Sequence, residues 1–523
     1  MAPERWFLTS EQRGNPYTGL DRRRSSGLAW TTGNEVRAVV HGRAYFTELL
    51  AGLRATRAGD LVLFTDWRGD PDERLSGPGT EVTRVLCEAA ERGAVVKGLI
   101  WRSHLDRLYF SAEENRHLGE EIEAAGGECI RDMRVRAGGS HHQKIVVLRH
   151  PGRPDRDIAY VGGIDLCHGR NDDAEHRGDP QAVGMAAAYG PRPPWHDIML
   201  AIRGPAVGDV EYSFRERWSD PTPVTRNPFL RLADLVRHDD DRPDAMPAQL
   251  PDPEPRGTQA VQVLRTYPYR RRGYPFAPDG ERSVARGYSR ALRQARGLVY
   301  VEDQYLWSVP VAESFAQALA DNPELRLIAV VPAYPDQPGT LADATQLRGR
   351  GQALAAMRRA GDDRVAVYGL ENRAGTPVYV HAKVCVVDDT WLGIGSDNFN
   401  LRSWTHDSEL SCAVMDEADP TGAHGGLPRQ VRLTLAREHL DRADGDDADL
   451  VDPAGAFAAF AKVADELEAW HGGGRVGPRP PGRVRWYRDP GAPRWARAAA
   501  AVLYPLFFDP DGRPGKLRRA GTF

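Results

Sequence analysis

The fold of this protein is decided by two related stretches, SHHQKIVVL at residues 140–148 and VYVHAKVCVVDD at residues 378–389. In each, a His-x-Lys pair enters an apolar run that predicts a β-strand, and the alternation of side chains places His and Lys on one face. Each is followed by a second strand-like run ending in a turn of small residues, IAYVGGIDLCHGRNDD at 158–173 and LGIGSDNFNLRS at 392–403. With 15 His and five Lys in 523 residues, less than one His-x-Lys pair is expected by chance, so the recurrence indicates two related sites.

The surrounding sequence alternates helical and strand-like patterns, which predicts α/β layers. In the first half we expect helices and strands in turn at 35–60 (helix), 61–67 (strand), 80–93 (helix), 94–101 (strand) and 113–125 (helix). In the second half we expect elements at 261–268 (strand), 282–297 (helix), 298–307 (strand), 310–323 (helix), 325–335 (strand) and 339–359 (a loop leading into a helix). The two halves share their element order, which predicts an internal duplication.

A break in the pattern separates the two halves. Residues 219–258 are rich in Pro and Asp and lack apolar periodicity, which predicts a linker. We therefore expect an N-terminal domain at 1–218 with the first His-x-Lys pair and a C-terminal domain at 259–523 with the second. Residues 173–194 are rich in Gly, Ala and Pro and are expected to form a surface loop.

Composition narrows the class of protein. Hydrophobic residues make up 41% and charged residues 27%, as in soluble globular proteins. A net charge of −4 argues against a strongly basic nucleic-acid binder. Five scattered cysteines without a CxxC argue against a disulfide framework or a structural zinc site. The N-terminus has no apolar signal region, and no apolar run reaches the roughly 18 residues needed to cross a bilayer. We expect a cytoplasmic protein without a transmembrane segment.

The two His-x-Lys sites have the residue types that phosphoryl transfer needs. If the two halves face each other, the histidine of one half can attack phosphorus, and the histidine of the other half can protonate the leaving oxygen. Lys144 and Lys383, beside His142 and His381, can neutralise the non-bridging oxygens. Only five of the 69 basic residues are Lys, so two at these sites are notable. The lysines supply the positive charge, so this chemistry requires neither a metal nor another cofactor.

Residues downstream of the two pairs complete the candidate site. The small residues Gly163 and Ser396 allow backbone N–H groups to approach a phosphate, and Asn398 can donate a hydrogen bond to it. Asp197 in PWHDIMLAIRGPA and Glu409 in HDSELSCAV begin apolar strands and are candidates to orient the histidines. Four further histidines lie near the first site, but their spacing fits no zinc pattern, so supporting or surface roles are expected for them: His141, His168, His176 and His196.

These motifs resemble the paired HKD motifs, HxKxxxxD followed by a Gly-Gly or Gly-Ser turn, of the phospholipase D superfamily. VGGIDLCHGRNDD, PWHDIMLAIRGPA, LVYVEDQYLW and HDSEL are similar to the larger enzymes of that family, which act on phosphatidylcholine. The resemblance extends from about residue 139 to residue 414. It implies an α/β fold in which two phospholipase D-like α/β/α sandwich domains pack face to face and share one active site.

The resemblance also implies roles for individual residues. His142 would be the nucleophile that forms a phosphohistidine. His381 would protonate the leaving alcohol and then activate water or an acceptor alcohol. Each histidine would be supported by a carboxylate from the other half, Glu409 for His142 and Asp197 for His381.

The remaining site residues are expected to hold the substrate or complete a motif. Lys144, Lys383 and Asn398 would bind the phosphate, and Asp388 completes the second HKD motif. The other positions expected to bind substrate are Gly163, Asp165 and Ser396.

The first motif departs from the family pattern. Arg149 stands where the family has Asp, and an inserted PGRPDRD follows before the strand resumes at Ile158. Asp157, at the end of the insertion, has the wrong spacing to replace the missing carboxylate. Catalysis need not be lost, because His142 and Lys144 remain.

The function predicted in this way is that of a phospholipase D. It would hydrolyse glycerophospholipids, with phosphatidylcholine giving phosphatidate and choline, and alcohols could compete with water in transphosphatidylation. The alternatives are a phospholipid synthase of the phosphatidylserine or cardiolipin type, a nuclease of the same superfamily and an inactive phospholipid-binding scaffold. The net charge of −4 weighs against the nuclease. The two intact His-x-Lys pairs weigh against the scaffold.

The expected partner is a phospholipid substrate at a membrane surface, with no nucleic acid, and the protein is expected to be a monomer, peripheral on the membrane. An apolar stretch at 494–508, followed by basic residues, is too short to span a bilayer. It is predicted to be a docked terminal helix, with contact to a membrane surface as the alternative.

Overall fold

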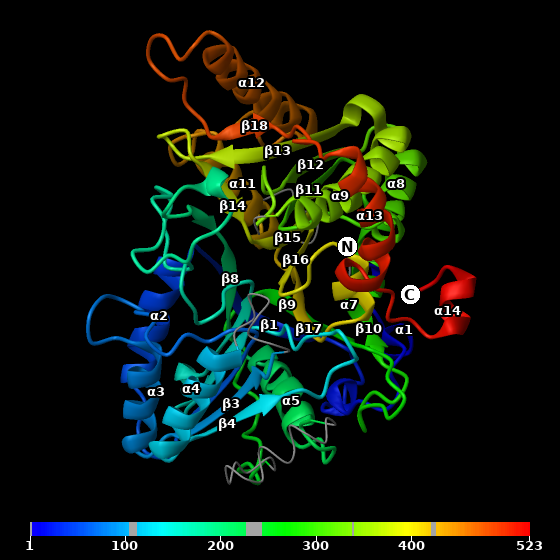
Figure 1. The fold of residues 1–523 in the computed structure, drawn as a ribbon. Coiled ribbons are helices and arrows are strands. Elements are labelled where there is room, and N and C mark those ends of the chain that lie inside the picture. Colours follow the sequence, from blue (N-terminus) through cyan, green and yellow to red (C-terminus); the bar gives the residue numbers. More distant parts are fainter. Residues whose placement is uncertain (1–2, 104–111, 226–242, 337–338, 420–424) are drawn as a thin grey trace.

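Two β-sheets form the framework of the protein (Figure 1). The structure, a computed structural model, describes residues 3–103, 112–225, 243–336, 339–419 and 425–523. The first sheet contains β1 (Thr31–Val40), β2 (Leu61–Asp66), β3 (Val95–Trp101), β4 (Glu128–Asp132), β5 (Ile145–Arg149), β6 (Ile158–Gly162) and β8 (Ile198–Arg203). The second contains β9 (Gln259–Tyr267), β11 (Leu298–Asp303), β12 (Arg326–Val330), β13 (Val365–Glu371), β15 (Lys383–Val387), β16 (Trp391–Gly395) and β17 (Glu409–Asp416).

The two sheets have the same topology. The strand order is β4-β3-β2-β5-β6-β8-β1 in the first and β13-β12-β11-β15-β16-β17-β9 in the second. In each, the first three strands of the order are parallel and the others pair antiparallel. Each position in one sheet thus has a counterpart in the other, and the predicted internal duplication is confirmed.

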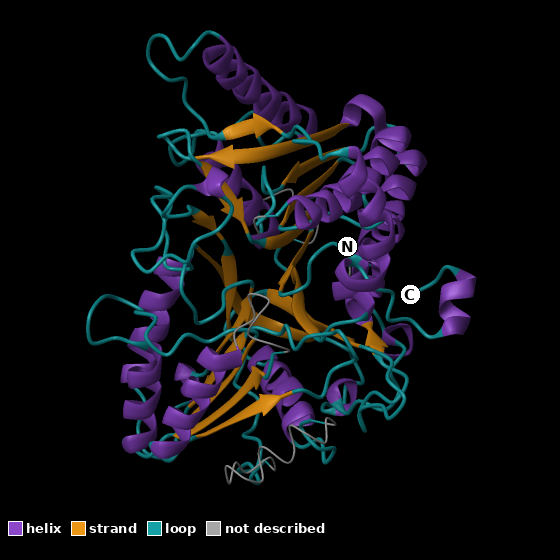
Figure 2. Ribbon diagram, in the orientation of Figure 1, coloured by secondary structure: helices purple, strands orange, loops and turns teal. Residues whose placement is uncertain are grey.

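Helices cover both faces of each sheet (Figure 2). The first sheet lies between α2 (Gly42–Arg54), α3 (Val82–Glu91) and α4 (Ala112–Ala124) on one face and α5 (Ala206–Trp218) on the other. The second lies between α7 (Ser283–Gln294), α8 (Val309–Asp321) and α9 (Thr340–Gly361) on one face and α11 (Leu427–His439) and α12 (Pro453–Gly472) on the other. Strand alternation explains the layers: Leu61 and Leu63 pack toward α5, and Val62 and Phe64 pack toward α2–α4. The protein therefore has the expected α/β architecture of two α/β/α sandwiches.

The sheets are joined to each other directly. β1 pairs with β9 at Thr31–Val261 and Asn34–Gln259, and one hydrophobic cluster runs through both sheets. Shorter elements complete the fold: α1 (Ser10–Arg13), β7 (Trp195–His196), β10 (Glu281–Arg282), β14 (Pro377–Val380), α10 (Leu401–Thr405), β18 (Val484–Trp486), α13 (Arg494–Leu503) and α14 (Gly515–Ala520). β14 runs parallel to β7, which links the two halves a second time.

Two sequence predictions are corrected here. Residues 35–40 belong to a strand and not to the predicted helix, because they pair along their length with β8. The first thirty residues were expected in the N-terminal domain, but Trp6 and Phe7 lie in the core on the second sheet. Gln262 of β9 exchanges hydrogen bonds of 2.8 and 2.9 Å with the backbone of Leu8. The second half is therefore built from both ends of the chain.

The predicted linker lies partly outside the described residues. Its segment 226–242 is not described, and residues 219–225 and 243–258 contain no helix or strand. The stretch at 339–359, predicted to begin as a loop, is helical from Thr340 onward. Among the described residues, no helix is both long and apolar enough to cross a membrane.

Candidate active site

Each His-x-Lys pair is positioned by backbone contacts with the other half of the protein. The backbone N–H of His142 donates to the backbone carbonyl of Ser408 at 2.9 Å, next to a β-bridge between His141 and Ser408. In the same way, the backbone N–H of His381 donates to the backbone carbonyl of His196 at 2.8 Å, beside the paired strands β14 and β7. The histidines thus precede β5 and β15 instead of lying within the strands, and each lies where a strand of the opposite half begins.

This arrangement pairs each histidine with a carboxylate of the other half. Nδ1 of His142 lies 2.9 Å from Oε2 of Glu409, and Nδ1 of His381 lies 2.6 Å from Oδ2 of Asp197. These are the crossed pairs that the family resemblance implies. Neither Nε2 has a hydrogen-bond partner among the described residues, so the ring atom opposite the carboxylate is available for chemistry.

Ser396 and Gly163 lie beside these carboxylates, which corrects their expected contact with phosphate. Ser396 donates its hydroxyl to Oε2 of Glu409 at 2.5 Å, and its N–H donates to Leu410. The N–H of Gly163 donates to Ile198, and a Cβ at Gly163 would lie only 2.2 Å from Oδ1 of Asp197. A small residue is required there to make room for the carboxylate, and the backbone N–H groups are already used by the sheet.

The two lysines are held in the same region. Lys144 donates to the carbonyl of His142 at 3.0 Å and lies 3.4 Å from Oδ1 of Asp165. Lys383 donates to Oε1 of Gln304 at 3.1 Å. Asp165 therefore pairs with a lysine, and as an anion it is not suited to the phosphate contact expected from the sequence. Asn398 is buried, and its Oδ1 has no hydrogen-bond partner within the described residues.

The charges of the site are set by burial and by neighbouring groups. Burial, together with Lys144, keeps the pKa of His142 well below its usual range. Burial and Lys383 lower the pKa of His381 to about 3, although Asp197 opposes the shift. Burial lowers the pKa of Lys383 to about 8, and burial followed by Asp407 raises the pKa of Glu409 to about 8. The free site thus favours neutral imidazoles, and a bound phosphate anion would offset the lysine charges.

These pKa values predict a bell-shaped pH dependence. Below about pH 8, Glu409 takes up a proton and loses the negative charge that supports the Nδ1–H of His142, and above about pH 8 Lys383 loses its charge. Because kcat/KM reports the free enzyme, it should be highest near pH 8 and fall on both sides. Initial rates of headgroup release at low substrate concentration between pH 6 and 10 would measure this. A flat profile over that range would contradict the assignment.

Aromatic side chains that the sequence analysis did not single out flank the histidines. The Trp195 ring lies 4.9 Å from that of His381, and the Trp67 ring lies 6.3 Å from that of His142. The Arg170 guanidinium stacks over Trp195 at 4.0 Å and lies 3.8 Å from Oδ2 of Asp165. The only sequence signal for Arg170 is its position shortly after the first small-residue turn.

Asp388, counted with the catalytic residues only as the member that completes the second motif, lies at the other end of β15 from Lys383. Its carboxylate accepts the N–H groups of Arg296, Gly297 and Leu298 at 2.7, 2.8 and 3.0 Å. It therefore fixes the turn that leads into β11, which is a structural role.

Arg149, the departure from the first motif, is also structural. It is buried, donates to Asp157 at 2.8 Å and to Pro251 at 2.6 Å, and pairs with Glu211 of α5. Asp157 therefore serves as a partner of Arg149 and not as a substitute for the missing aspartate.

Removing Arg149 should destabilise the protein. Arg149→Ala would leave Asp157 and Glu211 buried without their cation, which costs about 3–5 kcal/mol when one partner of a buried pair is lost. Urea unfolding of the wild type and the variant would measure the difference. A change below about 1 kcal/mol would show that this network does not stabilise the fold.

A second group of buried titratable residues adjoins the site. Nε2 atoms of His41 and His176 lie 2.8 and 3.0 Å from the carboxylate of Glu438, and Nδ1 of His196 lies 3.5 Å from it. His196 in turn contacts Glu302 through Nε2 at 2.7 Å. Three imidazoles and a carboxylate are ligand types that suit a divalent metal ion. The sequence predicted no metal ligands, because positions spread from 41 to 438 form no local motif.

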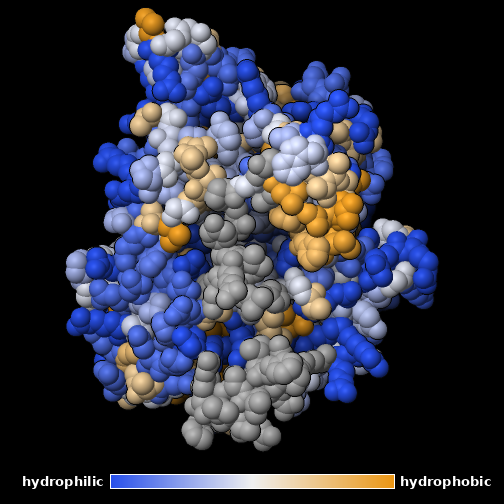
Figure 3. Space-filling view, in the orientation of Figure 1, coloured by the Kyte–Doolittle hydropathy of each residue, from blue (hydrophilic) through white to orange (hydrophobic). Residues whose placement is uncertain are grey.

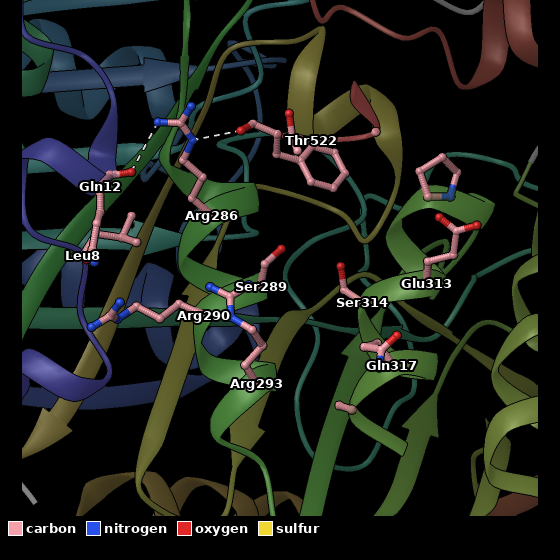
Figure 4. A pocket seen from close by; sticks show the side chains of 14 residues that line it. Leu8, Gln12, Arg286, Ser289, Arg290, Arg293, Glu313, Ser314, Gln317 and Thr522 are labelled. Carbon is pink, nitrogen blue, oxygen red and sulfur yellow. Dashed lines mark hydrogen bonds between the residues drawn. The ribbon is translucent and has the colours of Figure 1, made fainter. Parts of the chain in front are cut away.

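A hollow between α7 and α8 is unrelated to this site (Figure 4). It lies on the outer face of the second sheet, and none of the expected site residues lines it. Its arginines hold the chain ends: Arg286 donates to Phe523 at 3.0 Å, and Arg290 donates to Glu4 at 2.6 Å.

Comparisons with known proteins agree with the fold. The "Phospholipase D" family model matches residues 112–311, and the "Cardiolipin synthase, PLD-like domain" model matches residues 289–421. The chain is 25% identical over 495 residues to phospholipase D alpha 1 of Cynara cardunculus, covering 72% of this chain and 60% of that protein. It is 27% identical over 502 residues to phospholipase D alpha 1 of Arabidopsis thaliana, covering 71% and 60%.

A solved structure has the same fold. The phosphatidylserine synthase of Haemophilus influenzae aligns with a TM-score of 0.52 at 14% identity, covering 83% of this chain and 93% of that one. The duplicated sheets, the paired motifs and the two family models define the class: the chain belongs to the phospholipase D superfamily. It is similar to phospholipase D alpha 1 of these two plants, and it spans about 60% of the length of each.

Proposed function

We propose that the protein hydrolyses phosphodiesters by two-step transfer through a phosphohistidine. The observation that carries the proposal is the pair of crossed histidine–carboxylate contacts, in which each ring keeps Nε2 available beside a buried lysine. Two such groups around one phosphate provide a nucleophile and an acid.

In the first step, Nε2 of His142 attacks phosphorus while the P–O bond to the alcohol breaks. His381, which takes up a proton at Nε2 once the bound phosphate anion offsets the charge of Lys383, gives that proton to the leaving oxygen, and Asp197 stabilises the charged ring before transfer. In the second step, neutral His381 removes a proton from water, whose oxygen attacks phosphorus as the bond to His142 breaks. Lys144 and Lys383 neutralise charge on the non-bridging oxygens in both steps.

We propose a glycerophospholipid as the substrate, with phosphatidylcholine giving phosphatidate and choline. Support comes from relatives named phospholipase D alpha, from the similar motifs and from the aromatic side chains beside both histidines. An alcohol in place of water in the second step would give headgroup exchange. This route also describes the second candidate, a phospholipid synthase, which the fold match to a phosphatidylserine synthase keeps open.

Choline release from phosphatidylcholine tests the proposal. We expect release by the wild type with a chelator present, because the proposed steps use no metal. If no choline is released but phosphatidylglycerol or DNA is cleaved, phosphatidylcholine is not the substrate and the cleaved diester takes its place. No cleavage of any diester would favour the scaffold alternative. The cytoplasmic location at a membrane surface and the monomeric state remain predictions from the sequence.

A further inference from the structure

The C-terminal helical segment exposes an unusual set of large apolar side chains. It consists of α13 and the single turn that follows, Tyr504–Phe508. Its exposed fractions are 63% for Trp495, 63% for Val502, 61% for Leu506 and 65% for Phe507. Among the described large apolar side chains, only Val476 is more exposed. Figure 3 shows the resulting orange patch over α13, and we call these four residues the apolar patch.

The opposite side of the segment is firmly docked on the protein. Ala496 and Ala500 are buried against Ala344 of α9. Tyr504 packs edge-on against Trp307 at 6.1 Å and donates its hydroxyl to Asp509 at 2.9 Å. The segment is thus a docked helix, as the sequence predicted, whose outward face remains apolar. Patches of this kind on soluble proteins mark interaction surfaces.

Basic side chains lie on α13 itself, beside the apolar patch, and on α14, the next helix of the chain. They are exposed and form no side-chain hydrogen bond or ion pair within the described part of the chain: Arg494 and Arg497 on α13, and Lys516, Arg518 and Arg519 on α14. Free cations around an apolar centre are complementary to a bilayer with anionic headgroups, where the cations contact phosphate and the apolar groups enter the acyl boundary. A second copy of the chain would bring like charges together.

Hydrogen bonds connect the segment that carries the apolar patch to the segment that carries His142. Arg402 donates to the carbonyls of Phe507 at 2.9 Å and Gly138 at 2.6 Å, and to Asp407 at 2.7 Å. Asp407 in turn accepts the N–H of Ser140 at 2.8 Å, two residues before His142. One arginine therefore ties the patch to the segment that carries the catalytic histidine.

We propose that the apolar patch and the basic side chains of α13 and α14 are the surface by which the protein binds a phospholipid bilayer containing anionic lipid. The purpose of this docking rests on the proposed function: it would hold the segment that carries His142 against a bilayer that contains the phospholipid substrate. Binding itself does not depend on catalysis.

Vesicle binding by the full chain tests the assignment. The wild type, Leu506→Ser/Phe507→Ser and the matched control Val476→Ser would be sedimented with vesicles of phosphatidylcholine containing 30% phosphatidylglycerol. Burial of two large side chains predicts at least a tenfold loss of binding in the double variant and none in the control. Arg494→Gln/Arg497→Gln should lower binding to anionic vesicles several-fold and leave it unchanged at high salt.

Activity on a monomeric short-chain phosphatidylcholine separates this proposal from the proposed function. We expect the double variant to retain wild-type activity on that substrate, which shows that it is folded. Wild-type binding without any headgroup release would refute the function and leave the docking surface standing. Equal binding by wild type and double variant, or a wild-type dimer that the double variant dissociates and that ignores vesicles, would overturn the docking proposal.

Discussion

His142→Ala is expected to abolish headgroup release, with a loss on the order of 10⁵-fold in kcat. The reason is that the proposed route has no other nucleophile: Nε2 of His142 is the ring atom left available by the contact with Glu409. The variant should keep its fold, because the His142 side chain lies at the surface of the site, where it is 16% exposed, and is not part of the packed core. Release of the headgroup and the thermal transition would be measured on the same preparation.

His381→Ala distinguishes the acid from the nucleophile. It should lose as much activity as His142→Ala on a lipid with a poor leaving alcohol, because no group protonates the oxygen. With a p-nitrophenyl phosphodiester, whose leaving group needs no proton, His381→Ala should still give one rapid turnover, whereas His142→Ala should give none. Equal bursts from both variants would contradict the assigned division of roles.

Asp197→Asn is expected to reduce kcat by about 10³- to 10⁴-fold, the range seen when a carboxylate that orients a catalytic histidine becomes an amide. Asp197 accepts the Nδ1–H of His381 at 2.6 Å, and its own pKa is held below the usual range by His381 despite burial. An amide could present N–H to Nδ1 and so favour the wrong tautomer. The charged form of His381 would also lose its stabilising anion.

Asp388→Asn is the matched control for this experiment. Asp388 belongs to the second sequence motif, but its carboxylate receives three backbone N–H groups at the far end of β15. We expect kcat within about twofold of the wild type, because an asparagine oxygen still accepts at this turn. If the two variants lost activity equally, the contact between Asp197 and His381 would not explain the effect.

The duplicated architecture could be predicted from the sequence because the same strand-and-turn pattern occurs around His142 and His381. The crossed partners Glu409 and Asp197 came from the family resemblance, and the structure gives their physical cause, which is backbone pairing of each histidine with the opposite half. Local pattern misassigned residues 35–40, because antiparallel pairing with β8 outweighs their helical periodicity.

Other features could not be predicted because they depend on contacts between distant segments. The N-terminal Trp6 joins the core of the second half, and the buried group of His41, His176 and Glu438 unites positions that no motif connects. The roles of Gly163 and Ser396 were misassigned for the same reason: the small residues make room for, or bond to, carboxylates contributed by other strands.

The most direct test of the central claim is the mass of the covalent intermediate. His381→Ala would be mixed with a p-nitrophenyl phosphodiester, quenched in base and digested, because a phosphorus–nitrogen bond to histidine survives base and breaks in acid. We expect one added phosphoryl-containing group on the peptide that carries His142, and none in the His142→Ala/His381→Ala double variant. An adduct on another residue, or a burst of p-nitrophenol without any adduct, would contradict it.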